Sequence, residues 1–246
     1  MPLGSKNGTC CYIVCSWGGS RRSQQHPRLV VDGALYLREH VKRVLTFCKG
    51  IDRLIVASPR GNGFHKGYEE YLAELGKLRE VNGIPIEVFR RDNTGLSFGA
   101  YNDIFGKYRT KFDYYLVAED DYIPMIPGFD QILFRMIEGL PKCGFLCGLC
   151  NPGPGAGIFM GIIRATSLEK IWIKNGCLAR FSGCTYHEAE QSGQIGMSMS
   201  ILKEGYDIVD WTKTYSSPFW NCASTRTFGD PKLPPLFVPA QTFPFA

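Results

Sequence analysis

The first half of the chain alternates short apolar runs with amphipathic segments. The apolar runs have the length and content of buried strands. Between them, apolar residues recur every three or four positions, as in Leu37, Val41 and Val44, which predicts helices. The predicted strands cover 10–16, 51–58, 84–90 and 113–118, and the predicted helices cover 33–48, 67–81 and 97–108. Asn82 and Gly83 are expected to end the second of these helices. The alternation predicts an α/β fold with a mostly parallel central sheet and helices on both faces.

A sheet of this kind also predicts where a ligand binds. In open parallel sheets the crevice for a ligand lies at the carboxyl ends of the strands. Three segments directly follow predicted strands, namely the loop 17–28, the loop 59–66 and the acidic run 119–121. We therefore expect all three segments to lie on the same edge of the sheet.

The second half of the chain is less regular. It predicts helices at 127–139, from about 167, and at 187–204, and strands at 144–149, 157–164 and 206–210. A glycine-rich stretch covers 151–157, where small residues would let the backbone approach a ligand closely, or would simply form a loop. The tail from Ser216 is rich in proline and phenylalanine and has no period, which is typical of an extended arm or a mobile lid.

Length and charge narrow the class of protein. The 246 residues, 44% of them hydrophobic, are enough for one sizeable core. The net charge of +5 suits an anionic ligand such as a nucleotide diphosphate, and it is too small and dispersed for a nucleic-acid surface. No apolar run approaches the roughly 20 residues that span a bilayer.

Two observations bear on the compartment of the protein. The ten cysteines include several in apolar runs, which favours reduced thiols and a cytoplasmic protein. The first five residues, 1–5, resemble the scar left by a cleaved tag. A native membrane anchor could have been removed with it, so the alternative is the lumenal catalytic domain of a membrane-anchored enzyme.

Three adjacent carboxylates end the fourth predicted strand. Glu119, Asp120 and Asp121 repel one another unless a cation or solvent compensates their charge. Carboxylates suit oxygen-loving cations such as Mg²⁺ or Mn²⁺. A solvated turn at the end of a strand is the equally weighted alternative.

Two segments resemble glycosyltransferases. The run 93–102, NTGLSFGAYN, is similar to the N-x-G-x-x-x-A-R-N element of family 2 glycosyltransferases, with Tyr101 where arginine is usual. The run 116–121, LVAEDD, resembles their strand and DxD motif, with Ala118 where the first aspartate often stands. The form EDD followed by Pro127 and Phe129 is closer to the N-acetylglucosaminyltransferase I type. The resemblance extends from Cys10 to about Trp211.

The resemblance implies a GT-A fold with a Rossmann-like nucleotide-binding half. It implies a UDP-, GDP- or TDP-sugar donor, a hydroxyl acceptor such as a glycan, and Mn²⁺ or Mg²⁺. In the N-acetylglucosaminyltransferase I alignment Asp121 is the metal ligand, and Glu119 and Asp120 face the sugar or ribose of the donor. In the family 2 alignment Asp120 is the metal ligand.

The same resemblance divides the chain. We expect residues 6–246 to form a single GT-A domain. Its nucleotide-sugar-binding half covers 6–125, its acceptor-binding half covers 126–222, and the tail or lid covers 223–246.

Further donor contacts are expected from the loop after the first strand. Ser16 and Trp17 lie at the strand end, and Arg21 and Arg22 are candidates for phosphate contacts through charge-assisted hydrogen bonds. Arg91 and Asn93 follow the third strand on the same edge. The alternative for each arginine is an ordinary surface position.

An inverting transferase needs a carboxylate that takes the proton of the acceptor hydroxyl. Family 2 enzymes place this acid about eleven residues before a Gly-Tyr pair, where this chain has Gly193 and Gln194. The nearest acids are Glu190, which we favour, and Glu188. The alternative is that both are solvated glutamates in the first turn of a helix.

Two other functions fit parts of the sequence. The run 95–99, GLSFG, matches the G-x-S-x-G elbow of α/β-hydrolases, which predicts a serine esterase using Ser97 with Asp120 and His187. The elbow serine should directly follow its strand, and here the polar stretch 90–94 intervenes. The departures from the family motifs also allow a non-catalytic module that binds sugar or nucleotide.

Overall fold

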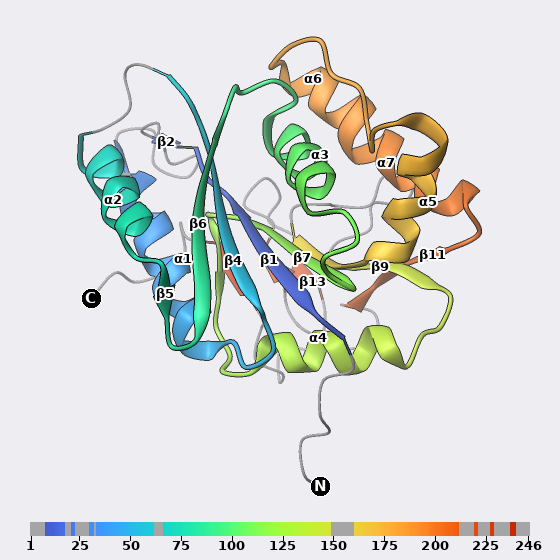
Figure 1. Ribbon diagram of the computed structural model, residues 1–246, viewed down its shortest axis with the longest axis horizontal. Coiled ribbons are helices and arrows are strands. Elements are labelled where there is room, and N and C mark those ends of the chain that lie inside the picture. The colour runs from blue at the N-terminus through green and yellow to red at the C-terminus, as the bar shows by residue number, and fades with distance from the viewer. Residues whose placement is uncertain are drawn as a thin grey trace, which may run out of the picture.

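A mostly parallel sheet of eight strands forms the centre of the molecule (Figure 1). The computed structural model describes residues 8–17, 21–22, 30–31, 33–61, 66–148, 160–211, 219–220, 227–228 and 237–239. The strand order is β11-β9-β10-β7-β1-β4-β6-β5. This confirms the predicted α/β class with helices on both faces of the sheet.

The elements follow the apolar runs of the sequence closely in the first half. The strands of the large sheet are β1 (Cys10–Cys15), β4 (Arg53–Pro59), β5 (Glu80–Val81), β6 (Ile84–Arg91), β7 (Tyr114–Glu119), β9 (Cys143–Cys147), β10 (Met160–Arg164) and β11 (Asp207–Asp210). The helices are α1 (Gly33–Phe47), α2 (Lys66–Lys77), α3 (Leu96–Tyr108), α4 (Phe129–Glu138), α5 (Ala165–Asn175), α6 (Tyr186–Glu188), the π-helix η1 (Ala189–Ile195) and α7 (Gly196–Lys203). Short strand pairs add β2 (Arg21–Arg22) with β3 (Val30–Val31), β12 (Phe219–Trp220) with β13 (Thr227–Phe228), and β8 (Tyr122–Pro124) with β14 (Phe237–Pro239).

The central strand β1 lies between β4 and β7 and runs parallel to both. Cys15 is in register with Ala57 of β4 and with Glu119 of β7. The three strands therefore end side by side. This confirms that the acidic run and the starts of the loops after β1 and β4 lie on one edge of the sheet.

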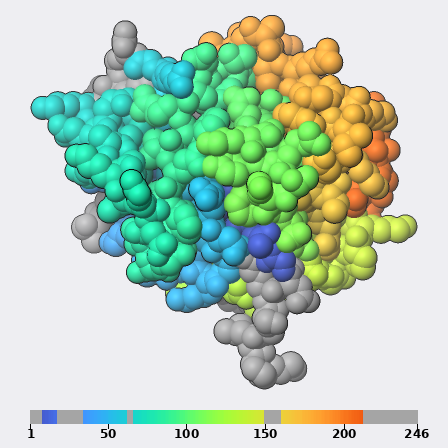
Figure 2. All heavy atoms as spheres, in the orientation of Figure 1, coloured from blue at the N-terminus to red at the C-terminus, as the bar shows by residue number. Residues whose placement is uncertain are grey.

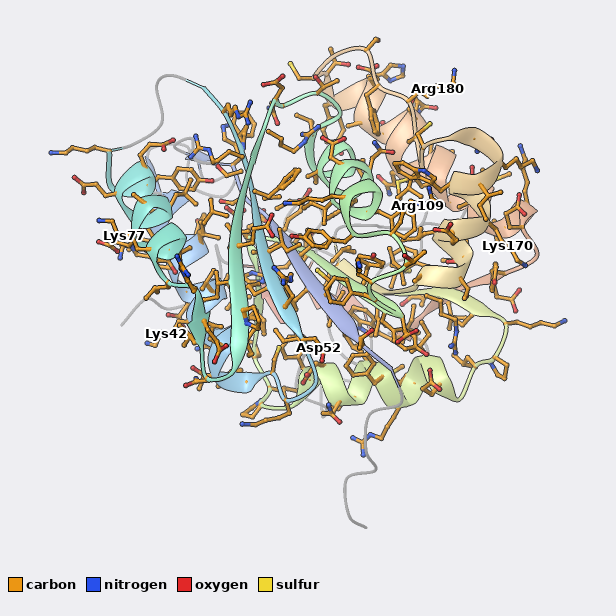
Figure 3. The ribbon with its side chains drawn as sticks, viewed as in Figure 1. Lys42, Asp52, Lys77, Arg109, Lys170 and Arg180 are labelled. Atoms are coloured by element: carbon orange, nitrogen blue, oxygen red, sulfur yellow. The ribbon has the colours of Figure 1, made fainter. Side chains whose placement is uncertain are left out.

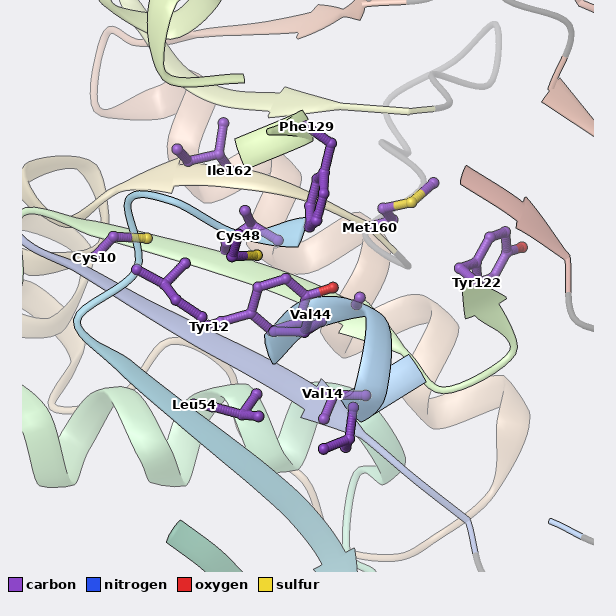
Figure 4. Packing of buried hydrophobic residues seen from close by; sticks show 14 of the residues in the cluster. Cys10, Tyr12, Val14, Val44, Cys48, Leu54, Tyr122, Phe129, Met160 and Ile162 are labelled. Atoms are coloured by element: carbon purple, nitrogen blue, oxygen red, sulfur yellow. The ribbon is translucent and has the colours of Figure 1, made fainter. Parts of the chain in front are cut away.

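Two apolar layers cover the two faces of the sheet. Alternate residues of β1 point to opposite faces, so Tyr12 and Val14 pack under α1, α2 and α4, while Ile13 and Cys15 pack under α3, α5 and α7. Figure 4 shows the first layer, with Tyr12 between the buried side chains of Phe129 and α1. Figure 2 shows the second layer from outside, where α3 and the helices after β10 cover much of the sheet.

The predicted helix 67–81 is wrong at its end. Helix α2 stops at Lys77, and β5 and β6 then form an antiparallel hairpin. Asn82 and Gly83 occupy the turn with φ of 54° and 79°. An Asn-Gly pair with two positive φ angles is the favoured two-residue hairpin turn, so here it joins strands rather than ending a helix.

The predicted helix 187–204 is divided into α6, η1 and α7. The middle part winds as a π-helix where Gly193 packs on Phe98, so closely that a Cβ at Gly193 would lie 2.4 Å from the phenylalanine ring. Strand direction also differs from a purely parallel sheet, because β10 runs antiparallel to β7 and β9. Within the described ranges, no helix has the length and apolar character needed to cross a membrane.

Candidate functional site at the carboxyl-terminal edge of the sheet

The ends of β1, β4 and β7 are joined by hydrogen bonds. The Ser16 amide donates to the Ala57 carbonyl at 2.9 Å, and the Asp120 amide donates to the Cys15 carbonyl at 3.0 Å. The Ser16 hydroxyl donates to Asp120 Oδ2 at 2.5 Å. The loop after β1 is therefore fastened to the acidic run by a charge-assisted hydrogen bond.

Asp120 belongs to a buried polar group under α1 and α2. Its side chain is fully buried, with 0% exposure. Nearby, Tyr68 donates to Ser58 Oγ at 2.9 Å, and its hydroxyl oxygen also lies 3.4 Å from the Ser16 carbonyl. The Asp120 carboxylate thus lies beneath the edge, among side chains that satisfy one another.

His40 completes this buried group from α1. Its Nε2 lies 2.8 Å from the Tyr12 hydroxyl, and its side chain is fully buried. Burial lowers the pKa of His40 to about 3, and the nearby backbone of Asp120 opposes that shift. His40 is therefore neutral in the folded protein.

Glu119 points to the opposite face of the sheet from Asp120, as consecutive residues of a strand do. Its Oε1 accepts a hydrogen bond from the Ser97 hydroxyl, at the start of α3, at 2.5 Å. Glu119 is half-buried. Burial, and next the Glu119 charge, raise the pKa of the Cys15 thiol. The pKa of the Tyr101 hydroxyl is also raised, by burial and then by Cys15 and Glu119.

The three carboxylates of the acidic run consequently do not converge as the sequence suggested. Glu119 and Asp120 lie on opposite faces, and Asp121 lies in the turn between β7 and β8 with 7% exposure. Among the residues that the structure describes, no three His, Cys, Asp or Glu side chains gather closely enough to hold a metal ion.

The other residues predicted to contact the donor lie in different surroundings. Trp17 directly follows Ser16 and is 55% exposed at the strand end. Arg21 and Arg22 form β2, which pairs with β3, and their side chains lie outside the described residues. The glycine-rich stretch 151–157 also lies outside them.

Arg91 and Asn93 form hydrogen bonds with the backbone of the turn before α3. The Arg91 guanidinium donates to the carbonyls of Thr94 and Leu96 and to Asp103 Oδ2, at 2.6, 3.3 and 2.7 Å. The Asn93 carbonyl accepts from the Leu96 amide at 3.2 Å. These contacts give Arg91 a structural role that its place after a strand did not indicate.

Glu188 lies on α6, which is near the top of Figure 1, and Glu190 lies on η1, which contacts α3. Glu188 Oε1 accepts from the Ser182 amide at 2.5 Å and from the Ser182 hydroxyl at 2.8 Å, and these two bonds lower the pKa of Glu188. Glu190 is half-buried in the first turn of η1. Glu188 therefore stabilises its own turn, as part of a capped start in which Thr185 accepts from the Glu188 amide.

Figure 3 shows the two edges of the sheet together. Asp52 marks the amino-terminal edge at the start of β4, and Arg180 lies at the opposite edge beside α6. Between α3 and α5, Arg109 forms an ion pair with Glu169. This ion pair joins the end of α3 to α5.

Sequence reasoning missed His40, Tyr68 and Ser58. One signal was available for His40, because it lies three residues after Leu37 on the apolar face of a predicted helix. A polar residue on a buried face requires a partner. Its partner on β1 could not be read from the sequence.

Comparisons with known proteins support the fold. No protein-family model matches the sequence, and no curated protein matches it either. Among solved structures, a cytidylyltransferase from Leptospira borgpetersenii is similar over 83% of this chain and 76% of its own, with a TM-score of 0.51 and 17% identity. A CMP:2-keto-3-deoxy-manno-octonic acid synthetase complexed with CTP is similar over 82% of this chain and 88% of its own, with a TM-score of 0.50 and 12% identity.

A glycosyltransferase from Streptococcus pneumoniae also matches. Its TM-score is 0.40 and its identity 13%, over 83% of this chain and 46% of its own. That likeness is too distant to support an argument. The other two structures show that this chain has a Rossmann-like α/β fold of the kind found in nucleotidyltransferases.

Proposed function

We propose that this protein is a metal-dependent glycosyltransferase that moves a sugar from a nucleotide-diphosphate sugar to a hydroxyl acceptor such as a glycan. The observation that carries the proposal is the carboxyl-terminal edge, where Ser16, Trp17 and the acidic run meet at the ends of β1 and β7. Ligands of open α/β sheets bind at this edge. A neighbour in fold was crystallised with CTP, which supports a nucleotide as the ligand class.

The nucleotide would bind on the side of the loop after β1. Trp17 offers an exposed ring for stacking with the base. Ser16 cannot move independently of the acidic run, since its hydroxyl is bonded to Asp120. Arg21 and Arg22, in the segment that follows, are proposed as phosphate contacts.

Asp121 is the proposed metal ligand. Asp120 is fully buried and accepts the Ser16 hydroxyl, so the alignment that makes Asp121 the ligand fits the geometry better. Mg²⁺ in phosphate-transfer sites is commonly held by one or two carboxylates, by water and by substrate phosphates. A single carboxylate fits such a site for Mn²⁺ or Mg²⁺. The cation would neutralise charge on the departing diphosphate.

Glu190 is the proposed general base of an inverting reaction. It lies on η1, which packs on α3 beside the residue that binds Glu119. A base on this side would face an acceptor that approaches from the wall of α3 and η1, opposite the nucleotide loop. Glu188 is the weaker candidate, because its carboxylate is engaged by Ser182.

The serine esterase is the less favoured function. Ser97 is the second residue of α3, six residues after the end of β6 rather than on a turn directly after the strand. Its hydroxyl donates to a carboxylate and not to a histidine. A nucleophilic serine needs a base positioned to take its proton.

The test is thermal unfolding with UDP, GDP, CDP, TDP, their sugar conjugates and CTP, each with and without Mn²⁺. A ligand that binds only the folded state at a hundredfold excess over its Kd stabilises it by about 2.7 kcal/mol. We expect a shift that requires both one nucleotide diphosphate and Mn²⁺, and that is lost in Asp121→Ala and reduced in Trp17→Ala.

Two results would contradict the proposal. A shift with CTP alone, followed by pyrophosphate release, would indicate a nucleotidyltransferase. Absence of any shift with every nucleotide would remove the transferase and leave the esterase to be tested with Ser97→Ala.

A further inference from the structure

The turn between β6 and α3 contains backbone that leucine rarely adopts. Gly95 and Leu96 have φ of 72° and 50°, both in the left-handed region. Glycine enters this region freely, but a bulky side chain does so at an energetic cost. The turn must therefore be held in place by its surroundings.

Arg91 holds the turn from the side of the strand. Its planar guanidinium reaches two consecutive parts of the turn, the carbonyls of Thr94 and Leu96, and is anchored to Asp103 on α3. The side chain is only 9% exposed. Gly99 makes room for this arrangement, because a Cβ there would lie 2.6 Å from the guanidinium.

The segment before η1 holds the turn from the other side. The Gly95 amide donates to the Gly183 carbonyl at 2.7 Å. A Cβ at Gly95 would lie 2.4 Å from the ring of Phe181, so the two segments are in close contact. The strained turn is thus fixed on both sides.

The residue that follows the strained pair is Ser97. Its hydroxyl donates to Glu119 Oε1 at 2.5 Å, and its carbonyl lies 3.7 Å from the Cys15 thiol. A serine hydroxyl can donate only one hydrogen bond, and here it is directed by a backbone that cannot relax. The turn consequently fixes the orientation of a half-buried carboxylate at the edge of the sheet.

We propose that Ser97 and Arg91 are positioning residues that orient Glu119 to accept a hydrogen bond from a sugar hydroxyl of the donor. This inference rests on the proposed function. It assigns to this turn the preference for a nucleotide that carries a sugar over the same nucleotide without one. The nucleotide itself is held on the opposite side, at Ser16 and Trp17.

The experiment compares the Kd of UDP with that of UDP-glucose, and the Kd of GDP with that of GDP-mannose, by calorimetry with Mn²⁺. The readout is the gain in affinity that the sugar provides. In Ser97→Ala we expect this gain to fall about tenfold, which is the size expected when a hydrogen bond to a charged group is lost. The Kd of the nucleotide alone should be unchanged. Ser97→Thr retains the hydroxyl and should restore the gain.

A matched control is Ser200→Ala. Ser200 also lies in a helix, and its hydroxyl donates to the Gly196 carbonyl at 2.8 Å on α7. This variant should keep the wild-type gain. An equal loss in both variants would mean that the effect is a general loss of helix stability, and it would overturn the inference.

Arg91→Lys tests the turn itself, with Arg90→Lys as its control. Arg90 forms a similar two-pronged contact, with Glu69 at 2.9 and 3.1 Å, but on the α2 side. Only Arg91→Lys should reduce the gain from the sugar. If the wild type binds nucleotides and Ser97→Ala keeps the full gain, or the wild type has none, the inference alone is overturned. If the wild type binds none of the four probes and none of the other nucleotides in the thermal-unfolding test, the proposed function is overturned with it.

Discussion

The two sides of the edge differ although consecutive residues build them. On the α1 side, Asp120, Ser16, His40 and Tyr12 form a buried group in which hydrogen bonds join neighbouring elements. On the α3 side, Glu119 is half-buried and accepts a hydrogen bond from Ser97, which follows a strained turn.

The comparison indicates that the two sides of one strand end have different roles. A buried carboxylate without exposure can support structure but cannot contact a ligand without rearrangement. A half-buried carboxylate is stabilised less by its surroundings and remains accessible. We infer that the buried group around Asp120 contributes stability, whereas Glu119 contributes a contact with the donor sugar, and the predictions below test that division of roles.

The largest expected effect is a loss of stability at low pH, caused by His40 on the α1 side. His40 has a pKa of about 3 in the folded protein against 6.5 for the free side chain. Between these values the unfolded chain binds the proton and the folded chain does not, so stability is lost as pH falls below about 6.5. The loss is about 1.4 kcal/mol per pH unit, and about 5 kcal/mol over the whole window.

The measurement is urea unfolding of the wild type and of His40→Gln at several pH values between 7 and 4. The wild-type advantage over the variant should shrink as pH falls, because glutamine does not titrate. His187→Gln is the control, since His187 is exposed and should leave the pH slope unchanged. A constant difference between the wild type and His40→Gln would show that His40 is not held neutral by burial.

The next effect concerns activity on the α3 side. If Glu190 is the base, Glu190→Gln should lower kcat about 100-fold or more without weakening nucleotide binding. Glu188→Gln should retain nearly full kcat, because an amide oxygen can still accept from Ser182. Release of nucleotide diphosphate with acceptor present measures both variants. The opposite ranking of the two variants would move the base to Glu188.

Much of the fold followed from the sequence because its signals are local. The apolar runs placed β1, β4, β6 and β7 within about two residues, and their order placed the edge. An Asn-Gly pair suits both a helix end and a hairpin turn, so the helix end predicted at Asn82-Gly83 is wrong. The π-helix η1 depends on the contact of Gly193 with Phe98, which is distant in sequence.

The candidate site was less predictable for a related reason. Glu119 and Asp120 were treated as one cluster, although strand alternation alone could have placed them on opposite faces. The hydrogen bond between Tyr12 and His40 depends on side-chain packing, and so do the hydrogen bonds of Arg91 to its turn. The periodicity of the sequence does not encode such packing.

The smallest predicted effect is on the free energy of unfolding, when these two carboxylates are replaced in turn. Asp120→Ala removes the acceptor of the Ser16 hydroxyl from a fully buried position, so it should lower the free energy of unfolding by about 2–3 kcal/mol. Asp120→Asn keeps a carbonyl oxygen for that hydroxyl and should cost about 1 kcal/mol. Glu119→Ala changes a half-buried side chain and should also cost about 1 kcal/mol or less. Urea unfolding at pH 7 ranks the three variants. If Glu119→Ala destabilised the protein as much as Asp120→Ala, both sides of the edge would be structural, and the division of roles between them would be wrong.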